Sequence, residues 1–325
     1  MKKLLMVMLS VLLLTSCSTP IARVGNIEIS KNEFEFYLKS IKEQMSDTEF
    51  QTEEDWQNKE IEGRKAIEVA KEQAMDNAAK NALYIATAKA AGISLTDADK
   101  QEVKGIKGEF MSVKGSDAGY KKFLKENNID DKFIELMCES SVYYRKIGEV
   151  VAEDTTITEE MKKSHFEENK TIIETGVRKA KHILIATIDP ETMQPKSQEE
   201  QEAASVLAKG IFDRIQSGEN FDKLMNEYSE DPGLSTSPDG YVFRSGEMVA
   251  EFEEAVDSVG FNQLAFCKSE FGYHIIKRLP VTYEDAKEEV EYDLLRSLIE
   301  KRVEQWQKEY SISVTRDEKM YSEIK

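Results

Sequence analysis

The pattern of apolar residues changes near Val177, and this change constrains the fold more than any other feature of the sequence. From Ser30 to about residue 169 the pattern is helical, and the stretch 57–91 has no proline and carries Ile67 and several alanines at helical spacing. Beyond Val177, short runs of β-type residues alternate with helical segments. A long helical part followed by a mixed part predicts an α+β chain with two domains.

The first part begins with two short predicted strands over residues 22–29, joined by a Gly-Asn turn. Ser30 and Glu33 form a capping box that predicts the start of a helix. After the long helix expected over 57–91, further helices are predicted from their start signals. One begins at residue 96, and the others span about 120–125, 130–151 and 158–169.

The second part is predicted to begin with a strand at 181–185, and its other elements follow at short intervals. The expected helices are 197–217, 221–228 and 251–257, and the expected strands are 241–243, 265–268 and 273–279. A last helix has an apolar stripe from Leu294 to Trp306. Because this stripe is too apolar to face water, we expect the helix to return to the N-terminal helices.

The N-terminus predicts export from the cytoplasm. Lys2 and Lys3 precede an apolar run that ends at Leu14, which is long enough for a signal peptide and too short to span a membrane. The segment Leu14-Thr15-Ser16-Cys17 resembles the lipobox of bacterial lipoproteins, so we expect Cys17 to be lipidated and to anchor the protein to the membrane. A soluble secreted protein is the alternative.

Composition limits the partners and the chemistry. The formal net charge of −18 disfavours nucleic acid and anionic lipid headgroups as partners. Beyond Cys17, the cysteines Cys138 and Cys267 lie far apart and suggest no disulfide framework. With 33% charged and 40% hydrophobic residues, the chain has the composition of a globular protein.

Four blocks of the second part resemble, in order, the parvulin family of peptidyl-prolyl cis-trans isomerases. The blocks are KHILI at 181–185, FDKLMNEYSED at 221–231, GEMVAEFEEAV at 246–256 and EFGYHIIK at 270–277. The resemblance implies a small antiparallel sheet flanked by helices. It also implies a reaction that needs no cofactor and no metal.

The same resemblance implies the catalytic residues. His182 and His274 would form a hydrogen-bonded pair beneath a proline pocket, Asp231 would shape the electric field near the substrate carbonyl, and Ser269 would supply a hydroxyl group. From the residues alone, the histidines could equally be a satisfied polar pair in the core, and Asp231 could be a turn residue.

Substrate-binding residues also follow from the resemblance: Met248 and Phe252 would receive the proline ring, with Tyr241 and Phe271 beside them. On spacing alone, Met248 and Phe252 could belong to the core instead. The family's usual Gly-Gly-Asp-Leu-Gly is replaced here by residues 237–241, SPDGY. The resemblance therefore does not say which residue forms one wall of the pocket. The loop after His182 has no arginine cluster, so we do not expect recognition of phosphorylated residues.

The whole chain resembles the arrangement of PrsA-type foldase lipoproteins and their SurA-like relatives. We expect a signal peptide at 1–16, an anchor and tether at 17–25, an all-helical chaperone domain at 26–176, a parvulin domain at 177–280 and a returning C-terminal helix within 281–325. The implied function is an extracytoplasmic isomerase and foldase. Its partners would be unfolded or partly folded exported proteins with X-Pro bonds, and a homodimer is also possible.

Three other functions stay open. The parvulin fold could serve only for binding in a holdase chaperone. His182, His274 and Asp231 could be metal ligands, although the spacing typical of zinc sites is missing. The anchor alone would suit a solute-binding lipoprotein, but the helical first half lacks alternating βα units. For His165, on a polar helix, we expect only a solvated or partly packed side chain.

Overall fold

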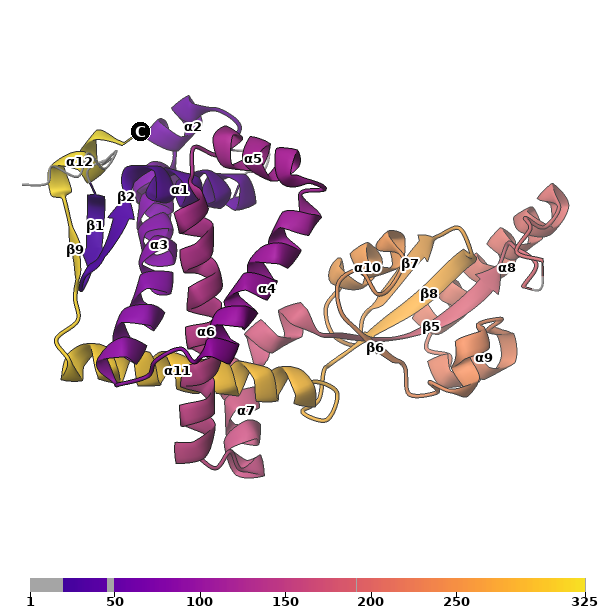
Figure 1. Cartoon of the computed structure of the whole chain (residues 1–325). Helices are drawn as coiled ribbons and strands as arrows, with labels where there is room; N and C mark the ends of the chain where they lie inside the picture. The colour runs from indigo at the N-terminus through magenta and orange to yellow at the C-terminus, as the bar shows by residue number, and fades with distance from the viewer. Residues whose placement is uncertain (1–19, 46–49, 191, 325) are drawn as a thin grey trace, which may run out of the picture. The chain divides into compact units, whose positions relative to one another are not determined.

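The computed structural model describes residues 20–45, 50–190 and 192–324, and the chain divides into two compact units (Figure 1). The first unit comprises the described residues up to Thr156 and those from Arg296 onward, and the second is Ile157–Leu295. The first is mostly helical and the second has an antiparallel sheet with helices, so the predicted α+β class is confirmed.

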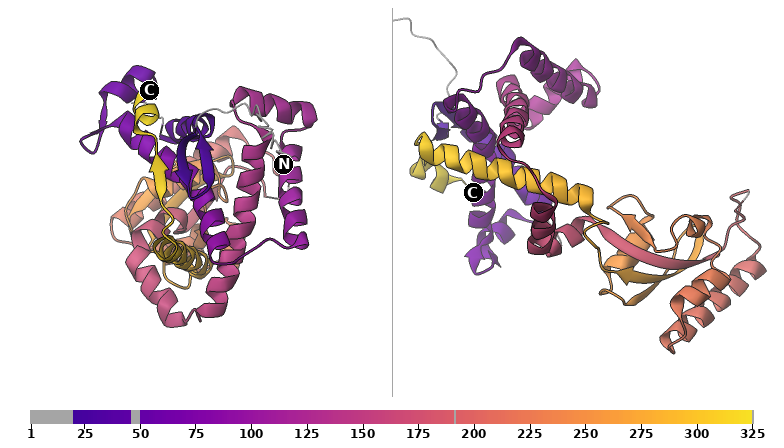
Figure 2. Two further views of the ribbon diagram at one scale, coloured as in Figure 1. Left: turned by 60° about the vertical axis from the view of Figure 1, so that its left-hand side comes forward. Right: turned by 90° about the horizontal axis from the view of Figure 1, so that it is seen from below.

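The first unit is built mainly from helices, some of which pack against a small sheet. Its helices are α1 (Lys31–Met45), α2 (Glu53–Asn58), α3 (Ala66–Ala90), α4 (Asp97–Val113), α5 (Asp117–Glu126), α6 (Asp131–Asp154), the second part of α11 (Lys287–Glu309) and α12 (Glu318–Glu323). Helix α3 packs against both α1 and α6 (Figure 2). Its Ala70, Ala74 and Ala78 are buried, which allows the close helix packing that their small size favours.

The first unit also has a three-stranded sheet, in which the two strands predicted over residues 22–29 are joined by a third strand, β9, that was not predicted. Strand β1 (Pro20–Val24) pairs with both β2 (Ile27–Ser30) and β9 (Val314–Arg316), and all pairs are antiparallel. Residues 20–24, which were expected in the tether, therefore belong to the folded unit. Ile21 and Val24 of β1 are fully buried, and this burial is the physical reason that the segment is ordered.

The helix expected over 57–91 is interrupted near its start. The structure has the short helix α2, then a hairpin of β3 (Glu60–Ile61) and β4 (Arg64–Lys65), and only then α3. Glu62 and Gly63 both have positive φ, of 52° and 77°. Such a pair makes the tight turn that suits a two-residue hairpin, and it cannot occur within a helix.

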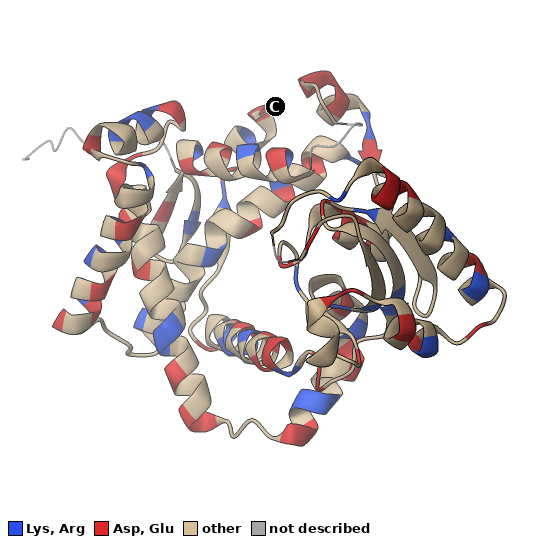
Figure 3. Cartoon of the chain, turned by 90° about the vertical axis from the view of Figure 1, so that its right-hand side faces the viewer, with Lys and Arg blue, Asp and Glu red and all other residues tan. Residues whose placement is uncertain are grey.

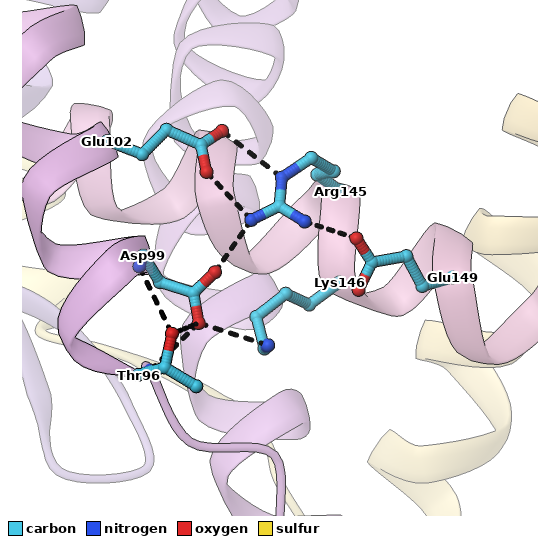
Figure 4. Close-up of polar contacts among 6 residues, drawn as sticks. All are labelled: Thr96, Asp99, Glu102, Arg145, Lys146 and Glu149. Carbon is cyan, nitrogen blue, oxygen red and sulfur yellow. Dashed lines mark hydrogen bonds and ion pairs between the residues drawn. The ribbon is translucent and has the colours of Figure 1, made fainter.

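A cluster of charged side chains holds α4 against α6 (Figure 4). Asp99 forms a capping box with Thr96 at the start of α4 and accepts hydrogen bonds from Arg145 (2.7 Å) and Lys146 (3.1 Å) of α6. These bonds, those from Thr96 first among them, outweigh desolvation and hold the pKa of Asp99 well below its usual range. Arg145 also bonds to Glu102 and Glu149.

The returning part of α11 belongs to the first unit, as predicted for a C-terminal helix that packs on the helical domain. The Tyr84 hydroxyl donates to Glu300 at 2.7 Å, and Arg302 donates to Asp154 at 2.7 Å.

Acidic and basic residues are interspersed along the helices of both units (Figure 3). The acidic excess is therefore spread along the chain.

The second unit contains a four-stranded antiparallel sheet in the order β6-β5-β8-β7. Its elements are α7 (Glu159–Gly176), β5 (Arg178–Ala186), α8 (Gln198–Gln216), α9 (Phe221–Tyr228), the 3-10 helix η1 (Pro232–Ser235), β6 (Tyr241–Phe243), α10 (Ala250–Asp257), β7 (Leu264–Lys268), β8 (Gly272–Leu279) and the first part of α11. Helix α7 packs through Phe166 and Ile173 against Val281 and Val290. It thus lies in the second unit, whereas the expected boundary was at residue 177.

Helices cover both faces of this sheet, and strand alternation decides which side chains each face receives. Ile183 of β5 and Ile275 of β8 pack with residues of α8 and α9. Ala180 and Ile276 lie on the other face and pack with Phe252 of α10. Because neighbours along a strand point to opposite faces, His182 and His274 share the α10 face.

Candidate active site

The sheet register brings the two histidines together. His182 on β5 pairs with Ile276 on β8, and His274 pairs with Leu184, so the histidines are diagonal neighbours on one face. Their Nδ1 atoms lie 3.0 Å apart, and their rings are nearly parallel with an interplanar angle of 10°. Both side chains are buried, and the Phe252 ring meets each of them edge-on.

Asp231 reaches His182 because the two residues before it dock on the main chain of β5. The Leu184 N–H donates to the Ser229 hydroxyl at 3.1 Å, and the Glu230 N–H donates to the Leu184 carbonyl at 2.8 Å. The Ala186 N–H donates to the Glu230 carboxylate at 2.6 Å. This segment therefore occupies an edge of β5 beyond the stretch that pairs with β6.

The Asp231 carboxylate accepts three hydrogen bonds. Its Oδ2 lies 3.0 Å from His182 Nε2 and 2.6 Å from the Tyr241 hydroxyl, and its Oδ1 accepts the Gly233 N–H at 3.2 Å. Burial acts to raise the pKa of Asp231, but the hydrogen bonds from His182 and Tyr241 outweigh it and lower the pKa to about 2. Asp231 is thus charged at neutral pH.

A charged Asp231 fixes the direction of the first bond in the hydrogen-bond series. A carboxylate only accepts, so His182 Nε2 carries a proton and donates to Asp231. If the His182 ring carries no second proton, its Nδ1 accepts from His274 Nδ1, and His274 Nε2 then accepts from the Ser269 hydroxyl at 2.7 Å. The Ser269 oxygen in turn accepts the Phe271 N–H at 3.1 Å.

The buried end of the series stays neutral at physiological pH. Desolvation, and secondly the neighbouring His182, lower the pKa of His274 to about 4, against the opposing effect of Asp231. Ser269 is also buried, in the turn between β7 and β8. The series thus runs from a neutral, buried interior to a single carboxylate at its outer end.

A cavity of about 580 Å³ opens above this series. Seven of the residues that the sequence pointed to line it: His182, Asp231, Tyr241, Met248, Phe252, Phe271 and His274. Ser269 lies behind it, bonded to His274. Cys17 lies outside the described residues.

The cavity also has walls that sequence reasoning missed. These are chiefly Leu184, Ala186, Ile188, Met193, Glu230, Glu247 and Val249. Leu184 and Ala186 follow His182 at every second position, so strand alternation could have revealed them. Ile188 and Met193 lie in an irregular loop, where no periodic signal exists.

Two further properties concern metals and membranes. Within the described ranges, no group of three or more His, Cys, Asp or Glu side chains is placed to hold a metal ion. Across those ranges, no helix combines the length and apolar character required to cross a bilayer.

The third histidine, His165, lies on α7, where its Nε2 is 3.0 Å from Asp293 and its side chain is largely buried.

Comparison with known proteins places the two parts of the chain in described families. The model of the PPIC-type peptidyl-prolyl isomerase domain matches residues 161–281, and that of the SurA-like N-terminal domain matches residues 4–148. The chain is 27% identical over 295 residues to foldase protein PrsA of Caldanaerobacter subterraneus, covering 87% of this chain and 84% of that protein. It is 30% identical over 236 residues to foldase protein PrsA 4 of Bacillus cereus, covering 65% and 82%.

Among solved structures, the chain is similar to foldase protein PrsA from Streptococcus pneumoniae at 16% identity and a TM-score of 0.31, with 80% of this chain and 95% of that chain covered. PrsA from Bacillus subtilis matches at 19% identity and a TM-score of 0.29, with coverage of 80% and 93%. The relationship itself follows from the sequence similarity to the Bacillus cereus relative, together with the two domain matches: this chain belongs to the PrsA foldase family.

Proposed function

We propose that this protein accelerates the cis-trans isomerisation of X-Pro bonds in exported, incompletely folded proteins, and that the cavity above the two histidines is where it does so. The chain is a parvulin-type peptidyl-prolyl isomerase and an extracytoplasmic foldase. The observation that carries the assignment of the site is the hydrogen-bond series Ser269, His274, His182 and Asp231 beneath an apolar cavity.

The chemistry needs no nucleophile. The barrier to rotation about the peptide bond, about 18–20 kcal/mol, arises from amide resonance. In the twisted transition state this resonance is lost, so the bond is less polar than in the planar ground state. A cavity that replaces water with Met248, Phe252 and Leu184 therefore favours the transition state.

In this proposal, the polar series gives the cavity a fixed electric field. His182 and His274 orient one another, Ser269 holds the tautomer of His274, and Asp231 places one negative charge at the outer end. Groups that are already oriented need no reorganisation when the substrate bond twists. Met248 and Phe252 would receive the proline ring, with Tyr241 and Phe271 as neighbouring walls.

The test is catalysis of proline isomerisation by the purified protein, measured by NMR exchange on a short proline-containing peptide. We expect Asp231→Asn to lower kcat/KM about 10- to 100-fold, because the side chain keeps its size and loses its charge. Asp213→Asn is a matched control, since Asp213 is exposed on α8 outside the cavity. Equal activity of the Asp231→Asn and Asp213→Asn variants would refute the role of Asp231.

A holdase with an inactive isomerase domain is not favoured, because the relatives of this chain are described as foldases and isomerases. Such a holdase would show chaperone activity but would not accelerate proline isomerisation in the peptide. The isomerase assay on the unmodified protein therefore separates the two functions. In this proposal the second unit, Ile157–Leu295, carries the isomerase activity, and the first unit carries the chaperone activity.

Attachment to the membrane through Cys17 is a further part of the proposal. It is supported by the apolar run up to Leu14 and by the lipobox-like residues before Cys17. Replacing Cys17 with Ser should release the protein from the membrane fraction, as measured by fractionation of expressing cells. Self-association into a homodimer rests only on the amphipathic N-terminal helices, and sedimentation of the purified protein would test it.

A further inference from the structure

The charged residues that line the cavity all carry the same sign. Among its described lining residues the ionisable groups besides the two histidines and Tyr241 are Glu230, Asp231 and Glu247, and neither lysine nor arginine is present. A substrate that enters this cavity therefore meets three carboxylates and no cation on its walls. The charge pattern bears directly on which substrates the site accepts.

Two of these carboxylates are held in place by the protein. Glu230 accepts the Ala186 N–H at 2.6 Å and lies 3.3 Å from Lys196 Nζ. Glu247 accepts the Arg244 N–H at 2.8 Å. Because their positions are fixed by main-chain donors, they cannot easily turn away from a negatively charged side chain.

Nearby cations do not cancel this negative charge. Lys196 pairs with Glu230, but Arg244 is shared between Glu247 and two further carboxylates, those of Glu288 and Glu289. Of the three carboxylates that line the cavity, only Glu230 has a cation to itself among these pairs, and Asp231 pairs with neither Lys196 nor Arg244. The walls of the cavity therefore keep a negative charge.

The remaining wall is apolar and comes from the loop after β5. Ile188, Pro190 and Met193 line the cavity, and Met193 is 56% exposed although it faces the site. The Met193 N–H donates to the Asp189 carbonyl at 2.9 Å, and the Asp189 N–H donates to the Gln194 carbonyl at 2.8 Å. These bonds hold Met193 at a φ of 56°, which is unusual for a residue other than glycine.

An exposed thioether beside a cavity gains contacts when a ligand covers it. Methionine is flexible and polarisable, and it adapts to apolar side chains of different shape. The cavity volume of about 580 Å³ lies within the range of about 300–1,000 Å³ found for small-ligand sites, so it has room for proline and a neighbouring residue.

We propose that this site selects its substrates by the residue before proline: large apolar side chains are accepted against Ile188 and Met193, and acidic or phosphorylated ones are rejected by Glu230 and Glu247. The proposal rests on the isomerase function assigned to the same cavity. It adds to that function a preferred class of substrate, namely apolar-Pro segments such as those of unfolded chains.

The experiment compares peptides that differ only before proline, with Leu, Ala, Lys, Glu or phosphoserine at that position. NMR exchange is the method, because it needs no auxiliary protease with a preference of its own. We expect kcat/KM for Leu-Pro to exceed that for Glu-Pro at least about tenfold at low salt. The difference between these two kcat/KM values should become smaller at about 1 M salt, where the Debye length falls to about 3 Å.

Variants assign the effect to the named residues. Glu247→Gln should raise the Glu-Pro rate relative to Leu-Pro about threefold, and Glu254→Gln, an exposed change on α10 outside the cavity, should leave the ratio unchanged. Met193→Ser should lower the Leu-Pro rate relative to Ala-Pro about threefold. Val206→Ser is its control, because Val206 is 73% exposed on α8 and does not line the cavity.

Each outcome has a distinct meaning. Acceleration of every peptide at similar rates, or a preference for Glu-Pro, would overturn the proposed selection and leave the isomerase function intact. No acceleration of any peptide would overturn the isomerase function of the cavity. A ranking that appears but is unaffected by both Glu247→Gln and Met193→Ser would show that other residues select the substrate.

Discussion

Asp231 is the charged end of the polar series in the site, and its low pKa depends mainly on two donors, His182 and Tyr241. The Tyr241 hydroxyl is the closer of the two, and the Tyr241 ring also meets the His182 ring edge-on. Its position depends on Gly233, since a Cβ atom there would lie 2.0 Å from the Tyr241 hydroxyl. Tyr241 was predicted only as a substrate-binding residue, and the structure gives it a second contact that positions the carboxylate.

Tyr241→Phe should therefore change the pH dependence of catalysis as well as its rate. The ring and its cavity wall stay, but Asp231 loses a donor, so its pKa rises from about 2. We expect kcat/KM at neutral pH to fall about tenfold, the effect of one hydrogen bond to a charged group. The acid limb of the pH profile should move to higher pH.

The two profiles, recorded from pH 3 to pH 8 by NMR exchange, isolate the contribution of Asp231. His274, with a pKa of about 4, titrates in both proteins, so the difference between them reports the carboxylate. Tyr292→Phe is the control because Tyr292 is 68% exposed on α11. An unchanged acid limb in Tyr241→Phe would mean that Tyr241 does not influence the charge of Asp231.

The same pKa shift has a consequence for stability. The folded-state pKa of Asp231 lies below the value of about 3.9 for an unfolded chain. Its contribution to stability is thus present above that pH and is lost as the pH falls toward 2. His274 acts in the same direction, and its contribution is lost as the pH falls from about 6.5 to about 4.

Among the elements, α4 is held by both apolar and polar contacts. Val103 is its one buried apolar side chain among those described, and Ile106 and Phe110 pack partly buried against the same cluster. Polar contacts of Asp99 with Arg145 and Lys146 of α6 add to this attachment (Figure 4). Thr96 fixes the start of the helix and the position of Asp99 together, so one cap serves two purposes.

Thr96→Ala should loosen α4 as a unit. Loss of an N-cap costs about 1 kcal/mol, which corresponds to about fivefold faster hydrogen exchange of the α4 amides if the helix opens locally. Ser112→Ala changes a hydroxyl on the same helix that only bonds back to Gly108, so it should have little effect. Equal exchange rates in both variants would show that the cap does not hold the helix.

At the scale of the whole molecule, the chain closes the first unit with its last residues. Beyond α11, strand β9 pairs with β1, and Tyr321 of α12 is buried with its ring 5.6 Å from that of Phe34. Lys71 Nζ lies 4.5 Å from the Tyr321 ring centre, and the Arg316 guanidinium lies 3.8 Å from it. The two ends of the described chain thus share one core.

Tyr321→Ala should destabilise the first unit by about 3–5 kcal/mol, the usual cost of removing a buried aromatic ring. Both tryptophans, Trp56 and Trp306, lie in that unit, so urea unfolding followed by tryptophan fluorescence reports it selectively. Isomerase activity reports whether the second unit is folded. In Tyr321→Ala we expect this activity to persist at urea concentrations that unfold the first unit.

Tyr310→Ala is the control because Tyr310 is 38% exposed. A simultaneous loss of fluorescence and activity in Tyr321→Ala would mean that the two units unfold as one. A variant with unchanged unfolding would show that the C-terminal segment contributes little to the core.

Much of the local structure could be predicted from the sequence, because its causes are local. Thr96, Asp130, Thr158 and Ser197 are helix caps in the structure as predicted, since each needs only a backbone N–H a few residues away. The β-type residues of 181–185 and 273–279 predicted strands. The helix expected over 57–91 differs, because a single Glu62-Gly63 turn is a weak signal inside a long stretch of helical pattern.

The sequence by itself determined most of the helices and strands and, through ordered motifs, which family the chain joins. Only the tertiary structure decided that Ser229 and Glu230 dock on β5, that β9 completes the sheet of β1, and that Met193 stands at the rim of an acidic cavity. These features depend on contacts between residues that are distant in the chain or that lie in irregular loops. No periodicity encodes such contacts, because they arise only when separately formed elements pack together.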